Sequence, residues 1–155
     1  MALRTGTDMP ELNGATEWLD GQASREQLLG TPTLIHFWAT SCYICKNNMP
    51  LLTQWKETYG PKGLNVVAVH APRGEADMDV VHVRETATEF HVDEPCAVDN
   101  EYALVDAFQI GGFWPHYFLF DADGKLRSRS AGDAGLSNIE STLSRLIDAP
   151  QPATV

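Results

Sequence analysis

The sequence predicts an α/β fold in which helices flank a central mixed sheet. Two continuous apolar runs, residues 32–39 ("PTLIHFWA") and residues 64–72 ("LNVVAVHAP"), are typical of buried strands. The segment between them has helical periodicity, so strand, helix and strand form a right-handed βαβ unit with parallel strands. A later segment, residues 115–132, is typical of an antiparallel hairpin, which makes the predicted sheet mixed.

The segment after the first strand repeats its apolar residues every three or four positions, which marks one buried face of a helix. The residues on this face are Cys45, Met49, Leu52, Trp55 and Tyr59. We expect the helix to end near "YGPKG", residues 59–63, because Gly and Pro interrupt the pattern there.

An insertion, largely helical, separates the βαβ unit from the hairpin. Its first helix is expected at residues 80–90, with Asp77 or Asp79 as the N-cap. A short strand follows at "PCAVD", residues 95–99, and a short helix around "YALVDAF", residues 102–108. The insertion therefore extends the fold between its two recognisable halves.

The hairpin at residues 115–132 contains Asp123-Gly124, a dipeptide suited to a tight turn between strands. The surrounding "DADG" resembles the opening of a calcium loop, but no Glu follows at its twelfth position, so we expect a plain turn. An amphipathic helix at residues 136–147 completes the fold. We expect residues 1–149 to form a single domain and residues 150–155 a flexible tail.

The chain has 155 residues, of which 43% are hydrophobic, a size that supports one core. Its 11 Lys and Arg against 21 Asp and Glu give a formal charge of -10, which disfavours binding to nucleic acid or an anionic membrane. No stretch is apolar over the about 18 residues of a membrane span, and the start lacks the apolar core of a signal peptide. We expect a cytoplasmic monomer; an exported domain with its leader removed is the alternative.

Cys42 and Cys45 lie three positions apart, directly after the first predicted strand. Such a pair is compatible with a redox couple, a metal clip, a structural disulfide or chance. The chain has 3 cysteines, too few and odd in number for a disulfide scaffold. Zinc needs about four ligands, but the histidines are scattered along the chain, at His36, His70, His82, His91 and His116.

The position of the pair predicts its chemistry. Because Cys42 lies where the helix starts, its sulfur faces free backbone N–H groups and the positive end of the helix dipole, which stabilise a thiolate. Lowering a thiol pKa from about 8.5 to about 6.5 raises the ionised fraction at pH 7 from about 3% to about 75%. Cys45 is nearly one turn later, on the buried face. We therefore expect Cys42 to attack a disulfide and Cys45 to resolve the mixed disulfide.

The stretch "FWATSCYIC" followed by "KNNMP" resembles the active site of thioredoxin-like proteins, with Trp38, Cys42, Cys45 and Pro50 in register. The opening "GTDMPEL" and the insertion are similar to the TlpA/ResA/YkuV-like branch of the AhpC/TSA-related redoxins. The resemblance covers residues 8–148. It implies a thioredoxin-like fold and a thiol-disulfide oxidoreductase that acts on protein disulfides or dithiols, with no cofactor beyond its own redox-active disulfide.

The same resemblance implies that the bond before Pro115 is cis and that this proline packs against the cysteine pair. The backbone of Trp114 would then be free to pair with a bound partner. Phe113, Trp114 and Trp38 are expected to form an apolar collar around the reactive sulfur. The competing explanations are core packing for Trp38 and an ordinary loop for Gly111 to Trp114.

Four positions depart from the residues found in thioredoxin or in its exported relatives. The residues between the cysteines are Tyr43 and Ile44, so the reduction potential of thioredoxin does not transfer; we favour a reductant because of the expected cytoplasmic location. His36 replaces a buried acid that helps to move the proton of the resolving cysteine, and Asn48 replaces an acid of some exported relatives. His36 is therefore either a proton carrier for Cys45 or a hydrogen-bonded core histidine.

Two further residues complete the set of candidates. The loop after the second strand, "HAPRGEAD", should border the cysteine pair because parallel strands end at the same edge of a sheet. Arg73 in this loop would support the thiolate or contact a partner, unless it is a solvated loop residue. Cys96, in the short strand of the insertion, is expected to be a buried, inert thiol rather than a third redox cysteine.

Other functions remain as alternatives. Peroxidases of the peroxiredoxin kind require threonine three positions before the reactive cysteine and proline seven before it, where this chain has Ala39 and Ile35. A thioredoxin-fold module that binds partners or metal without turnover is the non-enzymatic alternative. Reduction of insulin would separate the enzyme from the adaptor, and metal analysis with thiol titration would identify a metal module.

Overall fold

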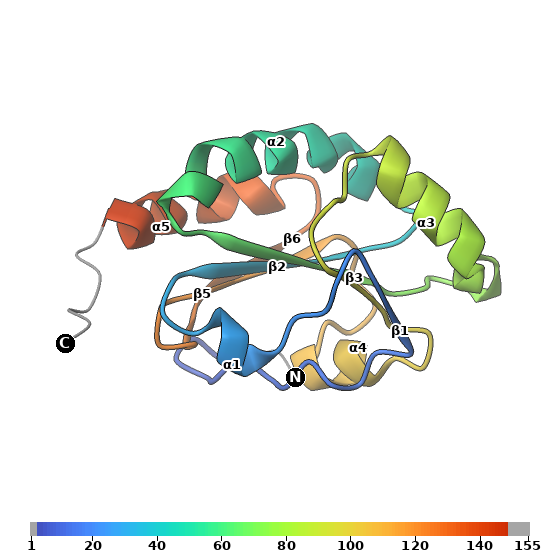
Figure 1. Ribbon diagram of the computed structural model, residues 1–155, viewed down its shortest axis with the longest axis horizontal. Helices are drawn as coiled ribbons and strands as arrows, with labels where there is room; N and C mark the ends of the chain where they lie inside the picture. Colours follow the sequence, from blue (N-terminus) through green and yellow to red (C-terminus); the bar gives the residue numbers. More distant parts are fainter. Residues whose placement is uncertain (1–2, 149–155) are drawn as a thin grey trace.

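The computed structural model describes residues 3–148, in which six strands form one mixed sheet with the order β1-β4-β3-β2-β5-β6 (Figure 1). The strands are β1 (Glu17–Leu19), β2 (Thr33–Trp38), β3 (Asn65–His70), β4 (Cys96–Val98), β5 (His116–Phe120) and β6 (Leu126–Ala131). Strands β2, β3 and β4 run parallel, while β1, β5 and β6 are antiparallel to their neighbours. The predicted α/β class is confirmed, and the predicted tail lies outside the described residues.

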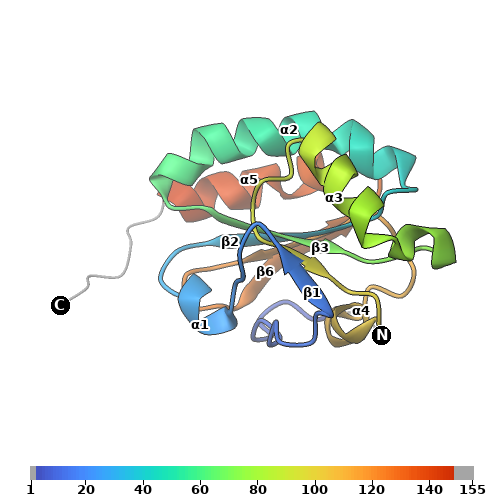
Figure 2. The ribbon, with the colours of Figure 1, turned by 45° about the vertical axis from the view of Figure 1, so that its right-hand side comes forward.

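Helices cover both faces of this sheet (Figures 1 and 2). The helices are α1 (Arg25–Leu28), α2 (Tyr43–Tyr59), α3 (Val80–Glu89), α4 (Ala103–Phe108) and α5 (Gly135–Asp148). Helices α2, α3 and α5 pack on one face, and α1 and α4 on the other. None of the helices in residues 3–148 has both the length and the apolar character needed to cross a membrane.

The central strand β2 explains how the two halves of the core are built. Leu34 and Trp38 face the core under α2, whereas Ile35 and Phe37 face the core over α4. All six residues of β2 are buried, because the strand is covered on both faces, as its continuous apolar run predicted. The strand pairs in parallel with β3, so the segments after both strands emerge at one edge of the sheet.

The amino ends of two helices agree with the sequence prediction. Helix α2 begins at Tyr43 with Cys42 as its N-cap, where the start of the helix was expected. The N-cap of α3 is Asp79, one of the two predicted candidates, and its side chain accepts the backbone N–H groups of residues 81 and 82. Asp77 lies in a 3-10 turn before the helix, and its carboxylate binds the hydroxyl groups of Thr40 and Ser41.

The hairpin and the insertion follow the prediction. Strands β5 and β6 are antiparallel, and the carboxylate of Asp121 accepts the N–H groups of Asp123 and Lys125, each at 3.0 Å, which closes the turn between them. Gly124 has φ +76°, the left-handed conformation that glycine adopts without strain. Elements β1 and α1 were not predicted, since runs of three and four residues carry no periodicity.

Candidate active site

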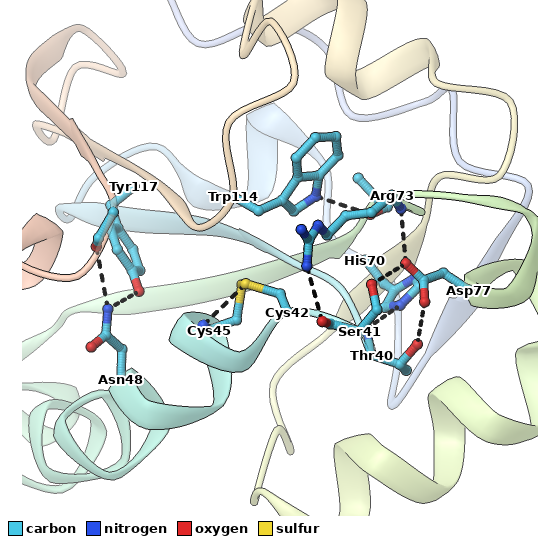
Figure 3. The surroundings of a disulfide bond; sticks show 12 residues. Thr40, Ser41, Cys42, Cys45, Asn48, His70, Arg73, Asp77, Trp114 and Tyr117 are labelled. Atoms are coloured by element: carbon cyan, nitrogen blue, oxygen red, sulfur yellow. Dashed lines mark hydrogen bonds between the residues drawn. A yellow bond between two sulfur atoms is a disulfide. The ribbon is translucent and has the colours of Figure 1, made fainter.

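The centre of the site is a disulfide between Cys42 and Cys45, whose Cα atoms lie 5.2 Å apart at the amino end of α2. The backbone N–H of Cys45 points at Sγ of Cys42 over 3.1 Å (Figure 3). The sulfur of Cys42 therefore faces the helix N–H groups, as predicted, and a thiolate formed there on reduction is stabilised by these groups and by the helix dipole. In the oxidised state both residues are nearly covered, with 3% of Cys42 and 1% of Cys45 exposed.

The loop before β5 lies next to the end of β3. The Trp114–Pro115 peptide bond is cis, as expected. The indole N–H of Trp114 donates to the carbonyl of Ala71 over 2.9 Å, which ties this loop to the segment that follows β3 (Figure 3). Neither the backbone N–H nor the C=O of Trp114 has a hydrogen bond within residues 3–148, so both are free to pair with another chain.

Three large apolar side chains around this site are exposed to solvent. Tyr43 is 75% exposed, Ile44 37% and Phe113 66%. Trp114 is half-buried and packs against both halves of the core. Trp38, in contrast, is 1% exposed, so the core packing considered for it is the explanation that the structure shows.

A buried carboxylate joins the two loops that flank the disulfide. Asp77 accepts hydrogen bonds from the hydroxyl of Thr40 (2.9 Å), the hydroxyl of Ser41 (2.7 Å) and the backbone N–H of Arg73 (2.8 Å). Burial raises the pKa of Asp77, but these three hydrogen bonds more than offset it and hold the pKa below its ordinary value. The sequence shows an acid in the segment after β3 and two hydroxyl residues in the segment after β2, but Asp77 was considered only as one of two N-cap candidates.

Arg73 reaches from the same loop toward the disulfide (Figure 3). Its Nη1 donates to the backbone carbonyl of Ser41 over 2.9 Å, directly before Cys42. The side chain is exposed and makes no salt bridge within residues 3–148. The expectation that this loop borders the cysteine pair is therefore confirmed, whereas the role of Arg73 in turnover stays a prediction.

His70, at the end of β3, supports the first residues of the β2–α2 loop. The backbone N–H of Thr40 donates to Nε2 of His70 over 3.1 Å. Burial lowers the pKa of His70 to about 4, so the ring is neutral near pH 7 and its proton resides on Nδ1. The ring also packs edge-on against Trp38, with ring centroids 4.9 Å apart, which holds both side chains in place at the ends of β2 and β3.

His36 belongs to a buried ionic cluster. Its Nε2 lies 2.5 Å from Oε2 of Glu94, and Nζ of Lys56 lies 2.7 Å from Oε1 of the same carboxylate. Burial raises the pKa of Glu94, but its hydrogen bond and electrostatic interaction with His36, together with those from Lys56, outweigh it and lower the pKa to about 2. Within residues 3–148 no hydrogen bond joins His36 to either reactive cysteine, so the structure shows a hydrogen-bonded core histidine; its proton-carrying role stays a prediction.

Asn48 and Cys96 have different surroundings. The side-chain amide of Asn48 donates to the hydroxyl of Tyr117 over 2.9 Å, and burial raises the pKa of that hydroxyl to about 12. Cys96 is fully buried, and burial raises the pKa of its thiol to about 12, as expected for an inert cysteine. Within residues 3–148 no three His, Cys, Asp or Glu side chains cluster as metal ligands.

Comparisons with known proteins agree with this geometry. The model of the AhpC/TSA family matches residues 5–129. Thiol-disulfide oxidoreductase YkuV of Bacillus subtilis is 45% identical over 140 residues, which cover 90% of this chain and 93% of YkuV. Protein DipZ of Mycobacterium tuberculosis is 30% identical over 147 residues, but the match spans only 21% of DipZ.

Solved structures share the fold. A thioredoxin-like protein solved in its oxidised form superposes with a TM-score of 0.85 at 43% identity, covering 94% of this chain and 97% of that protein. A thiol:disulfide interchange protein DsbE from Chlorobium tepidum superposes with a TM-score of 0.79 at 21% identity, covering 94% and 99%. With its cysteine pair at the helix end, the chain belongs to the AhpC/TSA family, in the TlpA/ResA/YkuV branch of thioredoxin-like thiol-disulfide oxidoreductases.

Proposed function

We propose that the protein reduces disulfides of other proteins through Cys42 and Cys45. The observation that carries this proposal is the disulfide between the two residues, with Sγ of Cys42 facing the N–H of Cys45 at the amino end of α2. A sulfur placed there is a stable thiolate and therefore both a good nucleophile and a good leaving group near neutral pH.

The reaction has two exchange steps. In the reduced protein the thiolate of Cys42 attacks one sulfur of the substrate disulfide, which forms a mixed disulfide and releases one substrate thiolate. Cys45 then gives up its proton and attacks Sγ of Cys42, which forms the intramolecular disulfide and releases the second substrate thiolate. Protons from Cys45 and from water neutralise the released thiolates, and two electrons have passed to the substrate.

The surroundings of the disulfide favour a protein as the partner. Tyr43 and Phe113 expose large apolar surfaces, which bind well to apolar groups of another chain. The unpaired backbone groups of Trp114 are suited to an extended peptide that adds to them by main-chain hydrogen bonds. Both features lie in segments that flank the reactive pair.

Four properties stay predictions from the sequence: the reducing direction, the cytoplasmic location, the monomeric state and the absence of a cofactor. The direction is set by the reduction potential, which ranges from about -270 mV in thioredoxin to about -120 mV in DsbA for the same motif. A potential near that of thioredoxin would support the reductant, and a potential near that of DsbA would identify an oxidant instead.

Reduction of insulin by dithiothreitol tests the proposal. The folded protein should accelerate precipitation of the insulin chains at catalytic concentrations, and the Cys42→Ser variant should not. No acceleration over buffer by the folded wild-type protein would favour the partner-binding adaptor and contradict the proposal.

The peroxidase alternative finds no support in the site. The positions three and seven residues before Cys42 are Ala39 and Ile35, both fully buried and neither able to donate a hydrogen bond from its side chain. A peroxide bound at the sulfur would therefore lack the threonine hydroxyl expected of such enzymes. Peroxide consumption by the reduced protein should be slow compared with its reduction of insulin.

A further inference from the structure

A pocket of about 350 Å³ lies beside the disulfide and has no part in the exchange chemistry described above. The residues that line it are Ser41, Arg73, Gly74, Ala76 and Asp77. Ser41 directly precedes Cys42, so any group that enters this pocket lies within one or two residues of the reactive sulfur. The pocket can therefore contact the substrate residues that neighbour the substrate's cysteine.

The two charged residues of the pocket are not equally available. Asp77 is buried, and its carboxylate already accepts three hydrogen bonds, from Thr40, Ser41 and the backbone of Arg73. The guanidinium of Arg73 is exposed and donates only from Nη1, to the carbonyl of Ser41, within residues 3–148. Since a guanidinium carries about five N–H donors, most of them remain free. The accessible charge of the pocket is positive.

Arg73 is also held in place before any ligand arrives. Its backbone N–H is bound to Asp77 and its Nη1 to Ser41, so both ends of the residue are anchored to the walls of the pocket. A planar guanidinium that is held in this way binds a carboxylate with less loss of side-chain entropy than a free arginine would. Carboxylates are the protein groups whose shape and charge match it.

We propose that Arg73 binds a carboxylate of the partner protein, from an Asp or Glu one or two residues away from the cysteine under attack. This inference rests on the proposed function and adds the substrate class to it: disulfides with a neighbouring acidic residue. Because the protein as a whole carries a formal charge of -10, the preference is local, and a substrate that is acidic throughout is repelled.

A set of disulfide peptides tests the proposal. The peptides differ only in Glu, Gln or Lys at the positions on either side of one cysteine. The rate constant for reduction by the reduced protein is measured for wild type, Arg73→Gln and Arg73→Glu. Arg84→Gln is the matched control, since it removes one exposed positive charge on α3, where Arg84 faces Glu17.

For the wild type and Arg84→Gln we expect the Glu peptide to react about two- to fivefold faster than the Gln peptide, the range of an exposed ion pair. Arg73→Gln should bring this ratio to about one, Arg73→Glu should favour the Lys peptide, and high salt should weaken each preference.

One result would overturn the inference and leave the proposed function intact: the same Glu-to-Gln ratio in wild type and Arg73→Gln. If all peptides were also slowed equally by Arg73→Gln, Arg73 would act on the sulfur of Cys42 and not on the substrate. If the wild-type protein reduced none of the peptides, the proposed function would fall together with this inference.

Discussion

The cysteines at the end of α2 and the cysteine in β4 show how position decides the chemistry of one side chain. Cys42 caps a helix and forms a disulfide with Cys45, with a backbone N–H directed at its sulfur. Cys96 lies in a strand between β1 and β3, fully buried, and burial raises the pKa of its thiol to about 12. The first environment stabilises a thiolate, and the second excludes it.

The difference does not come from exposure alone, because Cys42 is itself only 3% exposed in the oxidised state. It comes from what surrounds the sulfur. At the helix end a negative charge meets N–H groups that have no other partner, whereas at β4 the thiol is surrounded by core residues of the sheet. A reactive cysteine thus requires oriented dipoles more than it requires open solvent.

The largest expected effect comes from removing the capping sulfur. Cys42→Ser should abolish turnover in the insulin assay, because a serine hydroxyl is neither ionised near neutral pH nor able to form a disulfide. Cys96→Ala is the matched control and should retain activity. Activity in Cys42→Ser, or its loss in a folded Cys96→Ala, would break the comparison.

The Cys45→Ser variant distinguishes the attacking role of Cys42 from the resolving role of Cys45. The variant should still attack a substrate disulfide through Cys42 but should be unable to resolve the product, so mixed disulfides with the substrate accumulate. Non-reducing gels and mass spectrometry of the adduct check this outcome. Adducts attached through Cys96 instead of Cys42 would contradict the assignment of roles.

Alkylation of the reduced protein compares the thiols directly. At pH 7 an ordinary thiol is about 3% ionised, whereas a thiol with a pKa of about 12 is about 0.001% ionised. Iodoacetamide should therefore modify Cys42 at least about a thousandfold faster than Cys96, by peptide mapping over time. Comparable rates in the folded protein would show that the burial of Cys96 does not suppress its thiolate.

The stability of the interior next to Cys96 also depends on a buried charged side chain, that of Glu94. Glu94→Gln leaves His36 and Lys56 without their buried carboxylate and should lower the free energy of unfolding by about 3 kcal/mol at pH 7. Because the folded pKa of Glu94 is lowered to about 2 from 4.5, its stabilisation is present above about pH 4.5 and is lost as the pH falls through about 2. The difference between wild type and variant should shrink over this range.

Denaturant unfolding at several pH values measures this difference. Asp93→Asn is the matched control, because Asp93 pairs with the same Lys56 nitrogen at 2.9 Å but its side chain is 82% exposed. That variant should change stability little. Equal losses for the two variants, or a difference independent of pH, would count against a buried ionic cluster.

The smallest expected effect concerns two exposed apolar side chains near the disulfide, Tyr43 and Phe113. Tyr43→Ala and Phe113→Ala should each raise KM for insulin by about two- to fivefold with kcat unchanged, because they remove partner contacts and not reacting atoms. Val81→Ala is the control, since Val81 is 67% exposed on α3. A fall in kcat instead would place these side chains in the exchange step.

Most of the fold could be predicted because its long elements have clear patterns. The apolar run of β2, the periodic face of α2 and the Asp-Gly turn each follow from local sequence. Residue types at fixed spacing likewise identified the cysteine pair and, through the family resemblance, the cis bond at Pro115. The short elements β1 and α1 were beyond such patterns.

The contacts that support the site could not be predicted, because they join residues far apart in the chain. His36 and Glu94 are separated by 58 positions, and Thr40 and Asp77 by 37. Each partner alone looks like an ordinary polar residue, and only the packing of the loops brings them together. Local spacing offered both Asp77 and Asp79 as the N-cap of α3, and it could not show that Asp77 binds Thr40 and Ser41 instead.

A redox titration with peptide mapping shows which two cysteines exchange electrons. The protein is equilibrated in glutathione buffers of graded potential, alkylated and digested, and the state of each cysteine is read by mass spectrometry. We expect one reversible two-electron transition between a Cys42–Cys45 disulfide and two thiols, with Cys96 reduced throughout. Failure of the pair to form this bridge in any buffer, or a bridge that includes Cys96, would show that Cys42 and Cys45 are not the redox couple.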